Sequence, residues 1–190
     1  MNAMCRWMVG LLLMLSVTSA GLPSATQSWP AGERAGEYQL KSAFVYNLMA
    51  FVDWPQGALG DRIVVGFAGE GPMEAALSAF LKNKSVGSSA IEVRVVHARN
   101  DLRACNVLYL AYPDSTRTRD ALAQVRNASV LTIGDGEEFV RMGGVIGLVA
   151  QQKTLRLAIN PAAAQRARLT ISAKVLNMAS IVKEEGGARN

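Results

Sequence analysis

The chain has 190 residues, enough for one domain with a sizeable core. Half of its residues are hydrophobic and only 18% are charged, which excludes an intrinsically disordered protein. A single His excludes a multi-histidine metal site within one subunit, and two Cys exclude a zinc ribbon or a disulfide-stapled miniprotein. The net charge of +5 is a weak indication of an acidic partner, because the basic residues are scattered.

Residues 1–20 have the three-part pattern of a secretory signal peptide. Arg6 precedes an apolar run over residues 7–17, and Thr18-Ser19-Ala20 places small residues before a cleavage point after Ala20. The run is shorter than the roughly 20 residues that a membrane-spanning helix needs. We therefore expect an exported protein whose net charge is +4 after cleavage. Cys105 is then its only thiol, so no intramolecular disulfide can form.

The remaining chain alternates predicted helices and strands after a flexible leader at residues 21–36. Six segments have the apolar pattern of β-strands, at residues 62–68, 91–96, 106–111, 129–133, 144–150 and 154–159. Helical patterns occupy residues 37–54, 73–81, 115–125, 137–142, 162–167 and a last segment that runs from Ser172 to Val182. A polar tail at residues 183–190 completes the chain.

Local chemistry marks several element boundaries. Asp114 and Asn160 are expected N-caps, and Pro161 suits the first position of a helix. Residues 151–153 are short enough to join the last two strands as an antiparallel hairpin. The pattern predicts a single-domain α/β sandwich: a mixed sheet of about six strands, flanked by helices, with a C-terminal antiparallel hairpin.

Catalytic and cofactor motifs are weak. His97 is expected to end a strand, and a nucleophile–base pair with Cys105, as in a hydrolase, has no support from spacing. Cys105 is expected to be a buried, inert thiol, with an intermolecular disulfide as the alternative. The sequence Gly69-Glu70-Gly71 resembles the start of a dinucleotide fingerprint, but Glu74 replaces the third glycine and would repel a pyrophosphate.

The basic residues form one local cluster, Arg117, Arg119 and Arg126, without interleaved aromatic residues. Nucleic-acid binding is therefore not expected. We expect no cofactor, no metal ion and no catalytic residue.

Seven segments, in order, resemble the YfiR family. The opening helix carries Tyr38-Gln39-Leu40-Lys41-Ser42-Ala43-Phe44-Val45-Tyr46-Asn47-Leu48, followed by Phe51-Val52-Asp53-Trp54-Pro55. The other matching segments lie at residues 83–87, 104–110, 130–135, 143–146, 155–160 and 169–176. Together they place a YfiR-like α/β domain at residues 37–182.

This resemblance implies a periplasmic, usually dimeric, non-enzymatic regulator. The best-known members bind the periplasmic domain of a membrane-bound diguanylate cyclase, restrain cyclic-di-GMP synthesis and biofilm formation, and are sequestered by an outer-membrane lipoprotein. The alternative is a small-ligand-binding adaptor for another membrane sensor, such as a histidine kinase. Characterised members contain disulfides, so the unpaired Cys105 is a departure that puts internal redox control in doubt.

A regulator of this kind needs a partner-shaped surface. The candidate contacts, for a partner or for a second copy of the chain, are residues without an evident core or turn role: Tyr46, Asn47, Trp54, Arg156 and Lys174.

Overall fold

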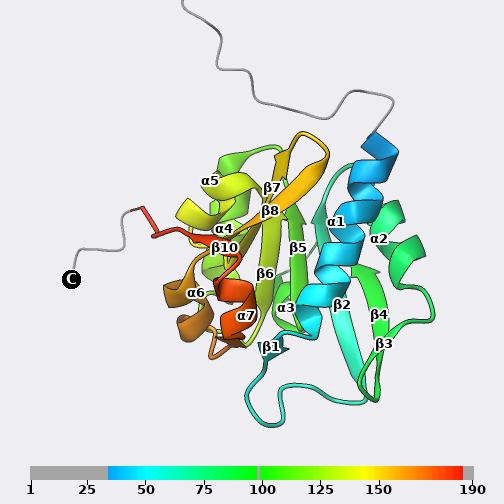
Figure 1. Ribbon diagram of the computed structural model, residues 1–190. Helices are drawn as coiled ribbons and strands as arrows, with labels where there is room; N and C mark the ends of the chain where they lie inside the picture. The colour runs from blue at the N-terminus through cyan, green and yellow to red at the C-terminus, as the bar shows by residue number, and fades with distance from the viewer. Residues whose placement is uncertain (1–33, 98, 186–190) are drawn as a thin grey trace, which may run out of the picture.

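A computed structural model describes residues 34–97 and 99–185 (Figure 1). The expected signal peptide and most of the leader lie outside these residues. The helices are α1 (Arg34–Met49), α2 (Met73–Leu81), α3 (Arg99–Arg103), α4 (Ser115–Val125), α5 (Gly136–Arg141), α6 (Pro161–Arg166) and α7 (Ala173–Leu176). The strands are β1 (Val52–Asp53), β2 (Arg62–Gly69), β3 (Ser85–Val86), β4 (Ser89–Val95), β5 (Val107–Ala111), β6 (Leu131–Asp135), β7 (Ile146–Gln151), β8 (Thr154–Ile159), β9 (Thr170–Ile171) and β10 (Ala179–Ile181).

Eight strands form one mixed sheet in the order β10-β8-β7-β6-β5-β2-β4-β3. Strands β4, β2, β5, β6 and β7 are parallel to their neighbours in this series, whereas β7–β8 and β3–β4 are antiparallel. The chain leaves β2 toward β4 on one side and then crosses back to β5 on the other. The strand order therefore reverses beside β2.

Helices cover both faces of the sheet because the central strands are apolar on both sides. In β5, Val107 and Tyr109 face the layer formed by α1, α2, α6 and α7, and Leu108 and Leu110 face α3, α4 and α5. Both sets are almost fully buried, which is typical of parallel strands between two helical layers. The result is a three-layer α/β/α domain with two hydrophobic cores.

The predicted fold class is confirmed. All six predicted strands are present, the hairpin between β7 and β8 is antiparallel, and two short edge strands, β3 and β10, extend the sheet. Both predicted N-caps form: the Asp114 side chain accepts from the Thr116 N–H, and Asn160 accepts from the Ala163 N–H.

Both terminal helices are shorter than the sequence predicts. The helix α1 ends at Met49 rather than at residue 54, because Val52 and Asp53 pair with β9 as a separate antiparallel ribbon. The last helix ends at Leu176, and the chain then extends to pair β10 with β8 instead of continuing helically to Val182. In both cases, strand pairing with a segment remote in sequence overrides the local helical pattern.

The short helix α5 packs directly on a floor of glycines. A Cβ atom on Gly134 or Gly144 would lie within 2.4 Å of the Phe139 ring, and one on Gly147 would lie 2.2 Å from the Gly136 carbonyl oxygen. Only glycine permits this approach, because any side chain would push the helix away from β6 and β7. The glycines thus fix where the C-terminal end of β6 meets α5.

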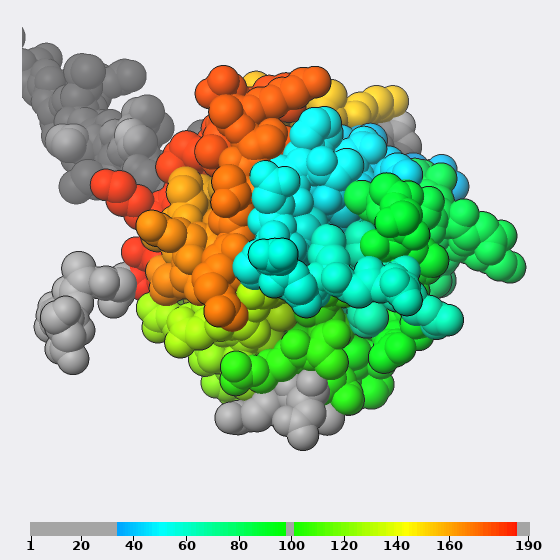
Figure 2. All heavy atoms as spheres, turned by 90° about the horizontal axis from the view of Figure 1, so that it is seen from below, coloured from blue at the N-terminus to red at the C-terminus, as the bar shows by residue number. Residues whose placement is uncertain are grey.

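The two-stranded sheet β1–β9 joins a segment near the start of the described chain to one near its end. Val52 pairs with Ile171 and Asp53 with Thr170. Figure 2, which views the molecule from below, shows the segment after α1 lying against the segment that contains α6 and α7. This end of the molecule is the one opposite the carboxyl ends of the parallel strands.

Candidate functional site

A crevice of about 600 Å³ opens at the carboxyl ends of the central parallel strands. Its floor comes from the residues that end β2, β5 and β6, namely Glu70 and Gly71, Ala111 and Tyr112, and Asp135. The strand order reverses here, and in open α/β sheets ligands bind outside the carboxyl ends of the strands at such a reversal. The crevice thus lies where this architecture places a binding site.

The walls of the crevice are largely apolar and aromatic. Tyr38 from α1 lies on one side, Phe139 and Met142 close the other, and Met73 begins α2. The ring of Tyr112 lies 4.4 Å from the Arg117 guanidinium, which also lies 3.6 Å from a Glu70 carboxylate oxygen. No Lys or Arg side chain lines the crevice among the residues that the structure describes.

A buried ionic cluster fixes Asp135 at the mouth of β6. The Lys41 ammonium, on a 5% exposed residue of α1, lies 2.7 Å from Glu37 and 3.0 Å from Asp135. The same Asp135 oxygen accepts a hydrogen bond of 2.7 Å from the hydroxyl of the fully buried Tyr109. The Asp135 side chain remains 56% exposed, so its carboxylate is both fixed from below and accessible from the crevice.

The cluster shifts the pKa values of its buried members upward. Burial alone would lower the pKa of Lys41, but the charges of Asp135 and Glu37 and their hydrogen bonds outweigh it, so the pKa is raised. Burial, with the charge of Asp135 second, raises the pKa of Tyr109 well above its ordinary value of 10.0. Each group therefore retains its proton more strongly in the folded state than in the unfolded state.

These shifts predict a loss of stability at alkaline pH. A pKa raised on folding contributes stability that is fully present below the unfolded-state value and is lost as pH rises through the folded-state value. The contribution of Lys41 and Tyr109 to the free energy of unfolding should therefore be complete and constant between pH 7 and 9, and should fall above about pH 10. Urea unfolding at a series of pH values measures the free energy of unfolding. In Tyr109→Phe this free energy should fall less steeply above pH 10. A fall that Tyr109→Phe leaves unchanged would contradict the assignment.

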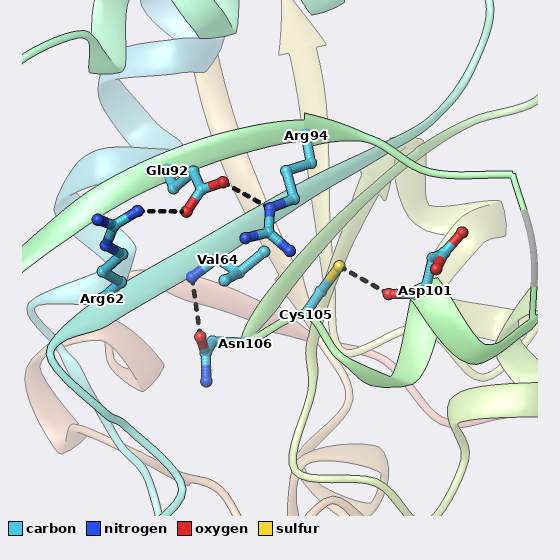
Figure 3. Close-up of polar contacts among 7 residues, drawn as sticks. All are labelled: Arg62, Val64, Glu92, Arg94, Asp101, Cys105 and Asn106. Carbon is cyan, nitrogen blue, oxygen red and sulfur yellow. Dashed lines mark hydrogen bonds and ion pairs between the residues drawn. The ribbon is translucent and has the colours of Figure 1, made fainter.

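The thiol of Cys105 is buried behind α3 (Figure 3). Its Sγ donates to the Asp101 carbonyl oxygen at 3.1 Å, and a Cβ on Gly66 would lie 2.4 Å from the sulfur. Burial raises the pKa of the thiol to about 11, against the opposing charge of Arg94. The predicted buried thiol is confirmed, and this enclosed setting opposes both an intermolecular disulfide and nucleophilic catalysis.

Next to Cys105, the side chain of Asn106 adds to the main-chain pairing at the start of β5, where the Asn106 N–H donates to the Val64 carbonyl. Its Oδ1 accepts from the Val64 N–H at 2.8 Å (Figure 3). Its Nδ2 donates to the Ala58 carbonyl at 2.9 Å. The Oδ1 bond holds the start of β5 to β2, and the Nδ2 bond attaches the loop before β2 to the sheet.

Cys105 should resist thiol reagents in the folded protein. At pH 8 a thiol of pKa about 11 is roughly one part in a thousand thiolate, and the sulfur is shielded as well. We expect labelling by iodoacetamide at least about 100-fold slower than at an exposed thiol introduced by Ser88→Cys. Mass spectrometry of the two peptides measures both rates in one sample. Comparable rates in the folded protein would contradict the burial of Cys105.

The other chemical candidates are dispersed. His97 is exposed just beyond β4, and within the described residues no group of three or more His, Cys, Asp and Glu could hold a metal ion. Of the expected arginine cluster, Arg117 lies against Tyr112, Arg119 bonds Ser115, and Arg126 pairs with Glu184. These arginines are therefore engaged within the domain.

Two of the five predicted contact residues lie on α1 and differ in role. The Tyr46 hydroxyl donates to the Ser85 carbonyl at 3.0 Å, and its ring meets Phe80 edge-on with centroids 6.5 Å apart. The Lys84 ammonium lies 5.3 Å from the Tyr46 ring centroid. Tyr46 therefore joins α1 to α2 and β3, whereas Asn47 is exposed.

The other three predicted contacts lie on separate elements. Trp54 is half-buried against the larger core, and Arg156 is exposed on β8. Lys174 is exposed on α7, with its ammonium 5.6 Å from the centroid of Phe51, which follows α1. The structure thus brings Lys174 to the end of α1 but does not unite all five residues in one surface.

Large exposed hydrophobic side chains accompany Lys174. Phe51 is 38% exposed, Met178 is 66% exposed and Ile181, on the edge strand β10, is 55% exposed. Because Phe51 contacts Lys174 and Met178 follows α7 directly, we call Phe51, Lys174, Met178 and Ile181 the α7 patch.

Sequence reasoning missed the crevice and its ionic cluster. The helical pattern of α1 places Leu40 and Phe44 on the buried line, yet both are only half-buried, while Lys41 and Ser42 are buried. One detectable signal was a lysine among apolar helix positions with Glu37 four residues before it. The contribution of Asp135 carried no such signal, because it depends on contact between α1 and β6.

The architecture and crevice define the class of protein: a three-layer, mainly parallel α/β domain with a binding-type crevice at the strand reversal. The family model described as YfiR/HmsC-like matches residues 38–180. The chain belongs to the YfiR/HmsC-like family, which consists of periplasmic regulators in cyclic-di-GMP signalling. No curated protein matches the chain.

Solved structures share the fold at low identity. One is the ABC domain in complex with L-Trp from Streptococcus pneumoniae, with 12% identity and a TM-score of 0.51 over 76% of this chain. Another is a conserved domain protein from Vibrio cholerae, with 14% identity and a TM-score of 0.51 over 77% of this chain. The chain spans about 60% of the length of each. Among the described residues, no helix has the length and apolar character to cross a membrane.

Proposed function

We propose that this protein is a non-enzymatic periplasmic regulator that binds the periplasmic domain of an inner-membrane sensor and represses a diguanylate cyclase. Membership of the YfiR/HmsC-like family is the observation that carries this proposal. In this proposal, residues 1–20 direct export and are removed. A homodimer and sequestration by an outer-membrane lipoprotein belong to the same proposal.

The α7 patch is the surface that suits the sensor best. It combines exposed apolar area from Phe51, Met178 and Ile181 with the cationic Lys174. Interfaces favour such apolar and methionine-containing centres with a charged rim. The patch also adjoins the open edge of β10, so a partner can add main-chain contacts there. An acidic side chain on the sensor would complement Lys174.

Membrane pull-down with periplasmic cross-linking in the native host tests the proposal. We expect an inner-membrane protein with a diguanylate cyclase domain to be retained, and deletion of the regulator to raise cyclic-di-GMP. Met178→Glu should reduce both retention and repression at least about tenfold, since it places a charge in the apolar patch. The matched control is Val95→Glu, which changes a 47% exposed residue near the opposite sheet edge. Retention of no cyclase, or unchanged cyclic-di-GMP, would overturn the proposal.

The crevice favours a second candidate function, a small-ligand-binding adaptor for another sensor, such as a histidine kinase. Its volume of about 600 Å³ falls within the range of about 300–1,000 Å³ that is typical of small-molecule sites. A bound metabolite, detected by native mass spectrometry of protein taken from the periplasm, would support this function.

A further inference from the structure

We propose that the crevice binds a small organic amine, with its ammonium on Asp135 and its apolar body between Tyr38, Tyr112 and Phe139. This inference rests on the second candidate function and adds the chemical class of the ligand. It is independent of the α7 patch, which lies on elements that do not line the crevice.

The charge balance beside the crevice favours a cation. Glu37 and Asp135 share the single ammonium of Lys41, at 2.7 and 3.0 Å, which leaves one negative charge in excess. The Lys41 and Glu37 side chains are only 6% and 13% exposed, whereas that of Asp135 is 56% exposed, so the excess charge is accessible mainly at Asp135. Glu70 adds a second carboxylate at the rim, although Arg117 lies 3.6 Å from it.

The position of Asp135 is fixed before any ligand arrives. Its Oδ1 accepts from Tyr109 and from Lys41, both of which are buried and held by the packing of β5 and α1. The glycine floor beneath α5 sets the backbone that follows Asp135. A carboxylate held in this way binds a cation with little loss of side-chain entropy.

The apolar and aromatic walls of the crevice complement the apolar part of an organic amine. Aromatic faces attract an ammonium group and pack against its apolar body. Tyr38, Tyr112 and Phe139 supply three rings, and Met73 and Met142 add adaptable apolar surface. An anion is disfavoured: although the N-terminus of α2 adjoins the crevice, Glu74 in its first turn and the carboxylates of Glu70 and Asp135 oppose negative charge.

Matched pairs of ligands test the class. The probes are 2-phenylethylamine against 3-phenylpropionate, tyramine against 4-hydroxyphenylpropionate, and cadaverine against glutarate. We expect at least one aromatic amine to shift the amide resonances of Asp135 and Tyr112 in NMR titrations of the folded protein. It should bind about tenfold more tightly than its acid partner, since only the amine complements the excess charge.

Variants assign the binding to the crevice. Asp135→Asn should weaken amine binding about tenfold, and Glu70→Gln, which leaves the buried cluster intact, should weaken it about threefold. Asp120→Asn removes an equal charge from the exposed surface of α4 and should have no effect.

Three outcomes would overturn the inference: acids binding as tightly as their amines, amine binding that neither crevice variant changes, or no amine shifting the crevice resonances at millimolar concentration. In the first case the crevice remains a ligand site and only the amine class fails. In the last case, if no acid shifts these resonances either, the adaptor function loses its support from the crevice as well, while the pull-down of a cyclase stands or falls separately.

Discussion

Replacement of Lys41 by Met should lower the free energy of unfolding by about 3–5 kcal/mol, the cost of breaking a buried ion pair from one side. The Lys41 ammonium is 2.7 Å from Glu37 and 3.0 Å from Asp135, and the Glu37 side chain is only 13% exposed. Without Lys41, a carboxylate with little access to water loses its counter-charge and α1 loses its polar contact with β6. Urea denaturation at pH 7 measures the change.

A solvent-exposed pair provides the control for this prediction. Arg141 and Glu137 also form an i,i+4 pair, at 2.8 Å, but their side chains are 37% and 40% exposed. Arg141→Met should cost less than about 1 kcal/mol, because water already screens the pair. The double variant Glu37→Gln with Lys41→Met should recover part of the loss, because it removes the unpaired charge. Equal costs for Lys41→Met and Arg141→Met would refute the proposed role of burial.

Gly147→Ala should destabilise the protein by about 3 kcal/mol, the upper end of the usual cost of overpacking. A Cβ there would lie 2.2 Å from the Gly136 carbonyl oxygen and 2.8 Å from a Val140 methyl group. Because the nearest atom is backbone, relief requires α5 to move away from β7. Thermal and urea unfolding measure the loss, and the Tyr38, Tyr112 and Asp135 amide resonances should report the displaced helix through the crevice.

Gly60→Ala is the matched control. Nothing lies within 4 Å of a Cβ at Gly60, and its backbone does not require glycine. Its effect on stability should be neutral or slightly favourable, because alanine restricts the unfolded chain more than glycine does. If Gly147→Ala were as well tolerated as Gly60→Ala, the close packing of α5 on β7 would be wrong.

Local chemistry predicted the parts of the fold that depend on neighbouring residues. Asp114 and Asn160 cap helices as expected, and the connection at residues 151–153 forms the hairpin. The end of α1 was not predictable in this way, because Val52 leaves the helical pattern to pair with Ile171. The three-residue strand β10 was missed for the same reason, since its pairing with β8 decides its conformation.

In the candidate site, too, the contributions of neighbouring residues were predictable and those of distant segments were not. The Gly69-Glu70-Gly71 sequence, which resembles the start of a dinucleotide fingerprint, lies at the end of β2 and contributes Glu70 and Gly71 to the crevice. Tyr38, Asp135 and Phe139 come from three other segments, so their convergence depends on strand order. Two predicted contact residues also depend on such distant pairings. Lys174 lies beside Phe51, and β1 and β9, which pair, lie between them in sequence. The Tyr46 hydroxyl donates to the Ser85 carbonyl.

The ribbon formed by β1 and β9 also has a kinetic consequence. Val52 and Ile171 lie near opposite ends of the described chain. They can pair only after all the residues between them have been synthesised and brought into place. Contacts so distant along the chain carry a large loop-closure cost and slow the folding of a domain. A nascent chain that emerges N-terminus first cannot secure the end of α1 until residue 171 has followed. Because this pairing forms late, the polypeptide stays incompletely folded for longer. An incompletely folded chain suits the export that residues 1–20 are expected to direct.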